Sequence, residues 1–210
     1  MNESFVLSAA NLAAYQEKID MSKLSSTFRD AIEVTRALGL QYLWADSMCI
    51  LQDDADDWNH ESATMSKVYG LSTCTIAAAN SGSGDSGCFA ARNQYRIRPC
   101  RVPNPFKRNS KYSFYVRSQY LHRIHDREVR RSQWYNRGWV FQERTHSPRL
   151  LIFSKTQMLW ACERLQAAEA WPCGKTSENY IDRFESFEME RARFHKLLDR
   201  EDDVLTSHST

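Results

Sequence analysis

Residues 24–79 read LSSTFRDAIEVTRALGLQYLWADSMCILQDDADDWNHESATMSKVYGLSTCTIAAA, and the expected architecture follows from this stretch. A helix is predicted from Ser25 or Ser26 to Leu38, because apolar residues recur on one face and Gly39 can end it. QYLWA at 41–45 and STCTIAAA at 72–79 predict two buried strands, joined by a helix at about 55–69. This alternation predicts an α/β fold with a mostly parallel sheet flanked by helices.

The remainder of the chain predicts a less regular second half that contains strands. YSFYVR at 112–117 is typical of a strand, and residues 150–153 and 157–162 predict a hairpin around 154–156. Residues 8–19 have a helix-favouring composition. Residues 180–203 are highly charged with an imperfect apolar stripe, which predicts an appended amphipathic helix. We therefore divide the chain into a domain at 1–174 and a charged helix and tail at 175–210.

Composition excludes several classes of protein. Of the 210 residues, 42% are hydrophobic and 26% charged, which is typical of a folded domain. No apolar run is long enough for a membrane span and no secretory leader precedes the domain, so we expect an intracellular protein. The six cysteines form no C-x-x-C pair, so neither structural zinc nor a disulfide framework is expected.

Charge is distributed unevenly along the chain. Residues 1–60 carry ten acids against four Lys or Arg, whereas residues 92–149 carry fifteen bases against three acids. The basic stretch could face solvent, complement the acidic segment or bind an anionic ligand. Nucleic acid is not expected as a partner, because no known DNA- or RNA-binding module accompanies the arginines.

Several acidic residues are candidates for chemistry. Asp53, Asp54, Asp56 and Asp57 crowd the start of the 55–69 helix, where carboxylates cap free N–H groups, and their contiguity does not predict a metal site. Glu61 falls on the apolar stripe of that helix, between Val68 and Met65. A carboxylate there needs an ion-pair partner or has a catalytic role, and the helical pattern leaves both readings open.

Three further residues are candidate ligand contacts. Asp46 directly follows the expected strand at 41–45, and in open α/β sheets ligands bind at the carboxyl ends of the strands. Arg137 and Arg144 lie in an aromatic-rich run, where a guanidinium either pairs internally or clamps a ligand.

Two blocks resemble the fungal heterokaryon-incompatibility (HET) domain. Residues 24–79 resemble its central block, and RGWVFQERTHSPRLLIF at 137–153 resembles its C-terminal block. The resemblance implies a cytoplasmic fungal protein that acts in non-self recognition and programmed cell death. It also implies signalling through domain assembly, with self-association or a protein partner and without a bound cofactor.

The HET fold is also thought to be a distant relative of Toll/interleukin-1 receptor (TIR) domains, some of which hydrolyse NAD. In those domains a glutamate shortly follows a helix-starting tryptophan, and here Trp58 and Glu61 occupy comparable places. The resemblance thus implies Glu61 as catalytic residue, with NAD as substrate contacted by Asp46, Trp58, Arg137 and Arg144. The carboxylate would orient the nicotinamide ribose and stabilise positive charge as the glycosidic bond breaks.

The chain also departs from the family pattern. Nothing in residues 1–23 matches the usual first block, Tyr-x-x-Leu-Ser-Tyr-x-Trp-Gly, so we expect the first strand of the sheet to be missing. Three hypotheses follow: an interaction module, an NAD-hydrolysing enzyme using Glu61, or an inactive truncated copy with an exposed sheet edge.

Overall fold

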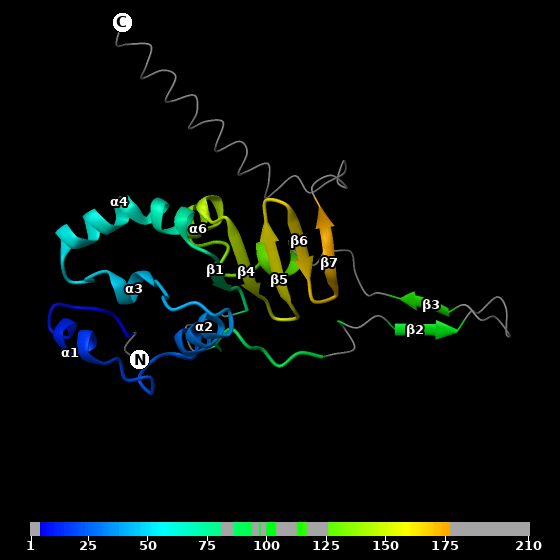
Figure 1. Cartoon of the computed structure of the whole chain (residues 1–210), viewed down its shortest axis with the longest axis horizontal. Helices are drawn as coiled ribbons and strands as arrows, with labels where there is room; N and C mark the ends of the chain where they lie inside the picture. The colour runs from blue at the N-terminus through cyan, green and yellow to red at the C-terminus, as the bar shows by residue number, and fades with distance from the viewer. Residues whose placement is uncertain are drawn as a thin grey trace, which may run out of the picture.

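The computed structural model describes residues 5–80, 86–93, 97, 100–103, 113–116 and 126–176 (Figure 1). The N-terminal part is helical and the C-terminal part of the described chain is mostly strand. The helices are α1 (Leu12–Glu17), α2 (Ser26–Ala37), α3 (Asp46–Cys49), α4 (Ala55–Leu71), the π-helical turn η3 (Asp126–Arg130) and α6 (Val140–His146). The strands are β1 (Thr75–Ala78), β2 (Cys100–Pro103), β3 (Ser113–Val116), β4 (Arg149–Phe153), β5 (Met158–Cys162), β6 (Leu165–Ala168) and β7 (Trp171–Thr176).

The first predicted helix is confirmed as α2, together with its stop signal. Gly39 has a φ of 73°, the left-handed conformation that a side chain disfavours. Its N–H donates to Arg36 C=O at 2.9 Å, and Leu40 N–H donates to Thr35 C=O at 3.0 Å. This Schellman arrangement satisfies carbonyls that the end of the helix leaves open, so the chain leaves α2 at a fixed point.

The predicted capping role of the acidic cluster is confirmed for Asp54 at the start of α4. Asp54 accepts hydrogen bonds from the N–H groups of Asp56 and Asp57. Asp57 Oδ2 accepts from Leu51 N–H at 2.8 Å, and Asp53 accepts from Ala9 N–H at 3.0 Å. Asp54 thus caps α4, while Asp57 and Asp53 hold the backbone at Leu51 and at Ala9 of the N-terminal segment.

The prediction of a mostly parallel sheet is wrong. Five strands form one sheet in the order β1-β4-β5-β6-β7, and only the β1–β4 pair is parallel. The pairs β4–β5, β5–β6 and β6–β7 are antiparallel. Short turns join these last four strands, and a short turn can only return the chain antiparallel, whereas parallel pairing needs a long crossover. The predicted 150–153 and 157–162 hairpin is confirmed as β4 and β5.

The predicted strand at 41–45 is also wrong. Leu40 to Ala45 follow α2 without helix or turn, but they pair with no strand among the described residues. The sheet ends instead at β1, which lies at the edge nearest helices α1 to α4 in Figure 1. QYLWA has strand-forming residues, and what it lacks is a neighbouring strand with which to form a ladder.

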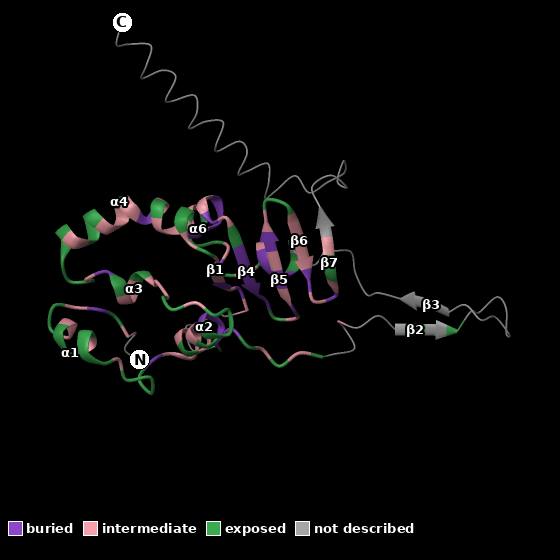
Figure 2. Cartoon of the chain, viewed as in Figure 1, coloured by how far each residue is buried: buried purple, intermediate pink, exposed green. Residues whose placement is uncertain are grey.

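The hydrophobic core covers both faces of the sheet. On one face, buried residues of β1, β4 and β5 pack with Val129, Trp134 and Val140. On the other face, Leu151 and Phe153 pack with Val34 of α2 and with Cys88. Figure 2 shows the resulting burial, concentrated in β4 and β5. The α/β character is thus confirmed, with a mixed sheet as its centre.

Two further predictions concern the rest of the chain. The strand expected at 112–117 is confirmed as β3, which pairs antiparallel with β2 in a separate two-stranded sheet. The amphipathic helix expected between residues 180 and 203 lies outside the described residues.

Candidate functional site

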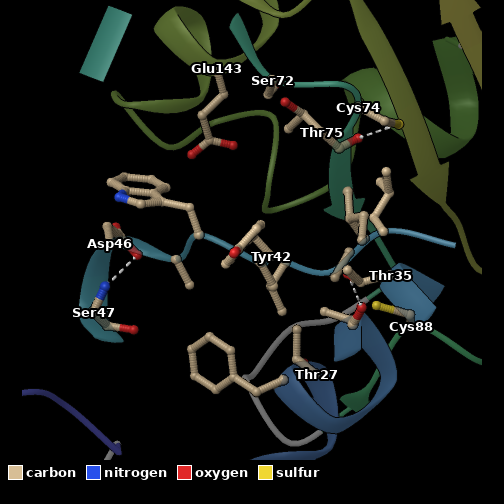
Figure 3. Close-up of a pocket in the computed structure, with 18 of the residues that line it drawn as sticks. Thr27, Thr35, Tyr42, Asp46, Ser47, Ser72, Cys74, Thr75, Cys88 and Glu143 are labelled. Atoms are coloured by element: carbon tan, nitrogen blue, oxygen red, sulfur yellow. Dashed lines mark hydrogen bonds between the residues drawn. The ribbon is translucent and has the colours of Figure 1, made fainter. Parts of the chain in front are cut away.

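A cavity of about 1480 Å³ lies between the helical part of the chain and the sheet (Figure 3). One wall is α2 with the segment Leu40–Ala45, and the opposite wall is the end of α4 with the start of β1. Gln133, Trp134, Arg137 and Glu143 line it from the chain around the start of α6. The apolar part of the lining comes from α2, the 40–45 segment and β1. Lys23, before α2, is one charged lining residue, and three others form a separate charged group.

The charged end of the cavity contains Asp46, Tyr69, Arg137 and Glu143. Trp134 Nε1–H donates a hydrogen bond of 3.3 Å to Glu143 Oε2, which orients the carboxylate. In Figure 3 the Glu143 carboxylate points away from the α6 ribbon, toward the side of the cavity on which Asp46 lies. Two carboxylates and one guanidinium therefore share one end of a cavity whose remaining lining is both polar and apolar.

Burial raises the pKa of the Glu143 carboxyl above its ordinary value of 4.5. Arg137 and the Trp134 hydrogen bond oppose this rise in pKa, because both favour the charged form, while the negative charge of Asp46 adds to it. A carboxyl whose proton is retained to higher pH can donate as well as accept a hydrogen bond. Perturbed acids of this kind are frequent at functional sites and also occur in structural networks.

Tyr69 is electrostatically coupled to the same group. Burial raises the pKa of its hydroxyl, and the charges of Glu143 and then Asp46 raise that pKa further, against the effect of Arg137. Its ring meets Trp44 edge-on, with centroids 5.6 Å apart. Tyr69 is therefore a neutral hydrogen-bonding group at neutral pH, held by an aromatic neighbour from the facing wall.

Two of the five predicted site residues line the cavity. Asp46 begins α3, directly after the 40–45 segment, and Arg137 precedes α6. The prediction placed Asp46 at the end of a strand, and although that strand does not form, the residue still reaches the cavity. Any role in binding NAD stays a prediction for both.

The other three predicted residues lie outside the cavity lining. Trp58 of α4 packs edge-on against Trp139, the residue before α6, with ring centroids 5.9 Å apart, and both side chains are partly exposed. Arg144 is 6% exposed, and its guanidinium lies 4.0 Å from the centroid of the Tyr135 ring. A buried cation over an aromatic face is typical of a packing contact.

Glu61 is half-buried on α4, where Met65 is the buried residue of the helix. Partial burial raises the pKa of the Cys49 thiol, as do the charges of Asp46 and Glu61, against a backbone hydrogen bond to Ala45. The charge of Glu61 thus acts on a residue of α3, while Glu61 itself is not among the residues that line the cavity. Its proposed catalytic role stays a prediction.

Glu143 and Tyr69 were not predicted as site residues. Tyr69 belongs to the apolar stripe of the 55–69 helix, a pattern that predicts burial and says nothing of a polar neighbour. Glu143 is the one acid in RGWVFQER, and an acid inside a buried aromatic run was the signal available in the sequence.

The described residues provide neither a metal-binding cluster nor a membrane-spanning helix. No group of three or more His, Cys, Asp or Glu side chains in this part of the chain is placed to hold a metal ion. Every helix there is too short or too polar to cross a lipid bilayer.

The fold and site together define a mixed α/β domain whose sheet ends beside a large, partly charged cavity. Comparison with known families places it further: the family model described as Heterokaryon incompatibility protein (HET) matches residues 3–143, two-thirds of the chain. The chain therefore belongs to the heterokaryon incompatibility family, and the resemblance predicted from its sequence is confirmed. A search of curated proteins and a search of solved structures each found no match.

Proposed function

We propose that this chain acts in the cytoplasm of a fungus in non-self recognition, and that it signals programmed cell death when copies of the domain assemble. The observation that carries the proposal is the family match over residues 3–143. Assembly needs no catalytic residue. It needs an exposed surface that a second copy of the chain can cover.

An exposed aromatic surface on α4 and α6 supports assembly. Trp58 and Trp139 are 37% and 47% exposed, and their rings are in contact. We call these two residues the aromatic surface. Large exposed aromatic side chains are enriched at the centres of protein interfaces, where they contribute much of the binding energy. The occupant that we propose is the same surface of a second copy, as in most symmetric assemblies.

The double variant Trp58→Ala, Trp139→Ala tests this surface. We expect wild-type protein to form larger species as its concentration rises in sedimentation velocity, and the variant to stay monomeric. Loss of two such anchors commonly weakens an interface by about 2 kcal/mol or more, roughly thirtyfold in dissociation constant. Expressed in a fungal host, the variant should lose cell killing in parallel.

Met21→Ala is the matched control, because Met21 is 39% exposed but lies between α1 and α2, away from the aromatic surface. It should assemble and kill as the wild type does, and thermal unfolding checks that all proteins are folded. The proposal is wrong if wild-type protein stays monomeric while killing cells, or if the double variant kills equally well.

Hydrolysis of NAD is a second candidate function. It is favoured by the convergence of Asp46 and Arg137 on one cavity, which the end of α4, the helix that carries Glu61, also lines. In this hypothesis Arg137 contacts a phosphate and Glu61 acts on the ribose. The cavity is large enough for a dinucleotide, since small-molecule sites are commonly about 300–1,000 Å³.

Glu61→Gln tests the second candidate, with NAD consumption by purified protein as the measurement. If Glu61 is catalytic, the variant should lose at least about a hundredfold in rate while unfolding at the same temperature. Glu33→Gln is the control, because Glu33 is an exposed glutamate of α2 outside the cavity lining. Unchanged NAD consumption in Glu61→Gln would refute catalysis by this residue.

A further inference from the structure

Arg137 has hydrogen-bond donors to spare at the charged end of the cavity. It belongs to the cavity lining, and its guanidinium forms no hydrogen bond or ion pair with the residues that the structure describes. The residue is exposed, so an anion can reach it from solvent. A planar guanidinium matches the oxygens of a phosphate with paired N–H donors. Arg137 is therefore suited to bind a phosphate group at this end.

The Glu143 carboxylate has spare hydrogen-bond acceptors at the same end. Within the described chain it accepts one hydrogen bond, from Trp134 Nε1–H to Oε2 at 3.3 Å, and its Oε1 accepts none. An ionised carboxylate has about four lone-pair sites, so Glu143 can accept further hydrogen bonds. The hydroxyl groups of a sugar are donors of this kind, and acidic side chains bind ribose hydroxyls in dinucleotide sites.

The mixture of charges decides between classes of ligand. A metal cation or a simple amine would be repelled by Arg137, and a bare inorganic anion would be repelled by Asp46 and Glu143. The three groups act as one cluster, because the charges of Arg137 and Asp46 both influence Glu143. A ligand with uncharged hydroxyl donors next to an anionic group satisfies both signs of charge. A ribose phosphate has this composition.

The protonation of Glu143 supports the same assignment. Burial raises the pKa of its carboxyl, against the charge of Arg137 and the hydrogen bond from Trp134. The donors that the protein supplies thus offset only part of the cost of burying the charged form. Sugar hydroxyls would supply further donors and stabilise that form. The Tyr69 hydroxyl lines the same end of the cavity and can donate to a sugar oxygen.

We propose that the charged end of the cavity binds a ribose phosphate, with the Glu143 carboxylate accepting hydrogen bonds from the sugar hydroxyls and the Arg137 guanidinium binding the phosphate. The inference rests on the second candidate function, because NAD contains ribose phosphate, and it adds Glu143 as the sugar-binding residue. It concerns binding alone, in which no covalent bond forms or breaks. The catalytic role predicted for Glu61 is tested separately by Glu61→Gln.

Ribose 5-phosphate is the probe, and the indole N–H of Trp134 is the reporter. Because this N–H donates to Glu143, its position in a proton–nitrogen correlation NMR spectrum responds when Glu143 meets a ligand. Trp134→Phe identifies the signal among those of the six tryptophans. We expect a saturable shift of this signal with a dissociation constant of about 1 mM, which is usual for a ligand of this size.

A comparison of two sugars tests the contact with Glu143. 2-Deoxyribose 5-phosphate lacks one hydroxyl, so it should bind the wild-type protein about tenfold more weakly than ribose 5-phosphate does. Glu143→Gln should bind ribose 5-phosphate about tenfold more weakly and should no longer distinguish the two sugars. A purely structural role of Glu143 would weaken the binding of both sugars equally and leave their ratio unchanged.

Arg137→Gln tests the phosphate contact. It should bind ribose 5-phosphate about tenfold more weakly and keep the preference over 2-deoxyribose 5-phosphate, because the sugar contact is intact. Glu33→Gln and Arg164→Gln are the matched controls, since both residues are exposed and lie outside the cavity lining. Both controls should bind as the wild type does, and thermal unfolding checks that every variant is folded.

The outcomes are distinct. Binding that prefers ribose, with the preference lost in Glu143→Gln and kept in Arg137→Gln, supports the proposal. No shift of the Trp134 signal at about 10 mM probe, equal binding of the two sugars by wild type, or an unchanged preference in Glu143→Gln overturns it. Ribose-selective binding without NAD consumption supports this inference and refutes the second candidate function, and NAD consumption without ribose-selective binding does the reverse. None of these results changes the expected effect of Trp58→Ala, Trp139→Ala on assembly.

Discussion

Glu143 shares the charged end of the cavity with groups from three other parts of the chain. Asp46 comes from α3, Tyr69 from α4 and Arg137 from the loop before α6. Burial raises the pKa of the Glu143 carboxyl, so the folded chain keeps this proton to higher pH than the unfolded chain does. Between the ordinary value of 4.5 and the raised value, the folded state binds more protons. The free energy of unfolding therefore falls as the pH rises through this window.

Glu143→Gln should remove that part of the pH dependence. The contribution of Glu143 is fully present below pH 4.5 and is lost as the pH rises through the folded-state pKa. Urea unfolding at intervals from about pH 4 to about pH 7 measures it. We expect the stability of the variant, relative to wild type, to increase across that range. A difference between the two proteins that stays constant with pH would contradict the assignment.

Site residues could be predicted only where their neighbours in the sequence form a recognisable pattern. Asp46 and Arg137 were identified because each is a charged residue beside apolar ones. Asp46 follows an apolar run, and Arg137 lies inside an aromatic-rich run. The partnership of Glu143 with Tyr69 was not predictable, since the two are far apart in sequence and meet through packing of α4 against α6. Arg144 resembled Arg137 in its sequence setting, yet it stacks on Tyr135 in the interior.

At the scale of elements, hydrogen bonds to Asp30 hold the segment 87–89 against α2. The Asp30 carboxylate accepts hydrogen bonds from Cys88 N–H at 2.6 Å and Phe89 N–H at 3.2 Å. Gly87 has a φ of 70°, and a Cβ there would lie 2.4 Å from Asp30 Oδ2. The close approach of this segment to α2 thus depends on the absence of a side chain at position 87.

Gly87→Ala should therefore destabilise the chain by about 1–3 kcal/mol, through backbone strain and displacement of Asp30. Gly138→Ala is the matched control, because a Cβ at Gly138 meets nothing within 4 Å. Chemical unfolding of the two variants measures the difference. Equal stability of Gly87→Ala and Gly138→Ala would show that the contact between this segment and α2 does not depend on the glycine.

Helices and hairpins were predicted better than sheet topology. The residues of α2, α4 and the β4–β5 hairpin have local patterns that are sufficient to form them, with caps and turns included. Strand pairing is not local. QYLWA at 41–45 has strand composition, but whether it enters a sheet depends on a neighbour elsewhere in the chain, and none is found among the described residues.

At the scale of the whole molecule, the sheet has one edge at β1 and the other at β7, and the helices gather near β1 (Figure 1). The cavity lies where these helices and the β1 edge meet. The aromatic surface on α4 and α6 lies outside that cavity. The aromatic surface and the cavity are therefore separate features, so assembly and ligand binding can be tested independently.

Native-state hydrogen exchange of the chain alone tests most directly whether the sheet ends at β1 and leaves the cavity open. We predict slow exchange in β4 and β5, which pair on both sides, and fast exchange at Gln41 to Trp44, whose amides make no hydrogen bond to the described chain. Exchange at Gln41 to Trp44 as slow as in β4 would contradict the account, because it would show that this segment is already paired in a sheet.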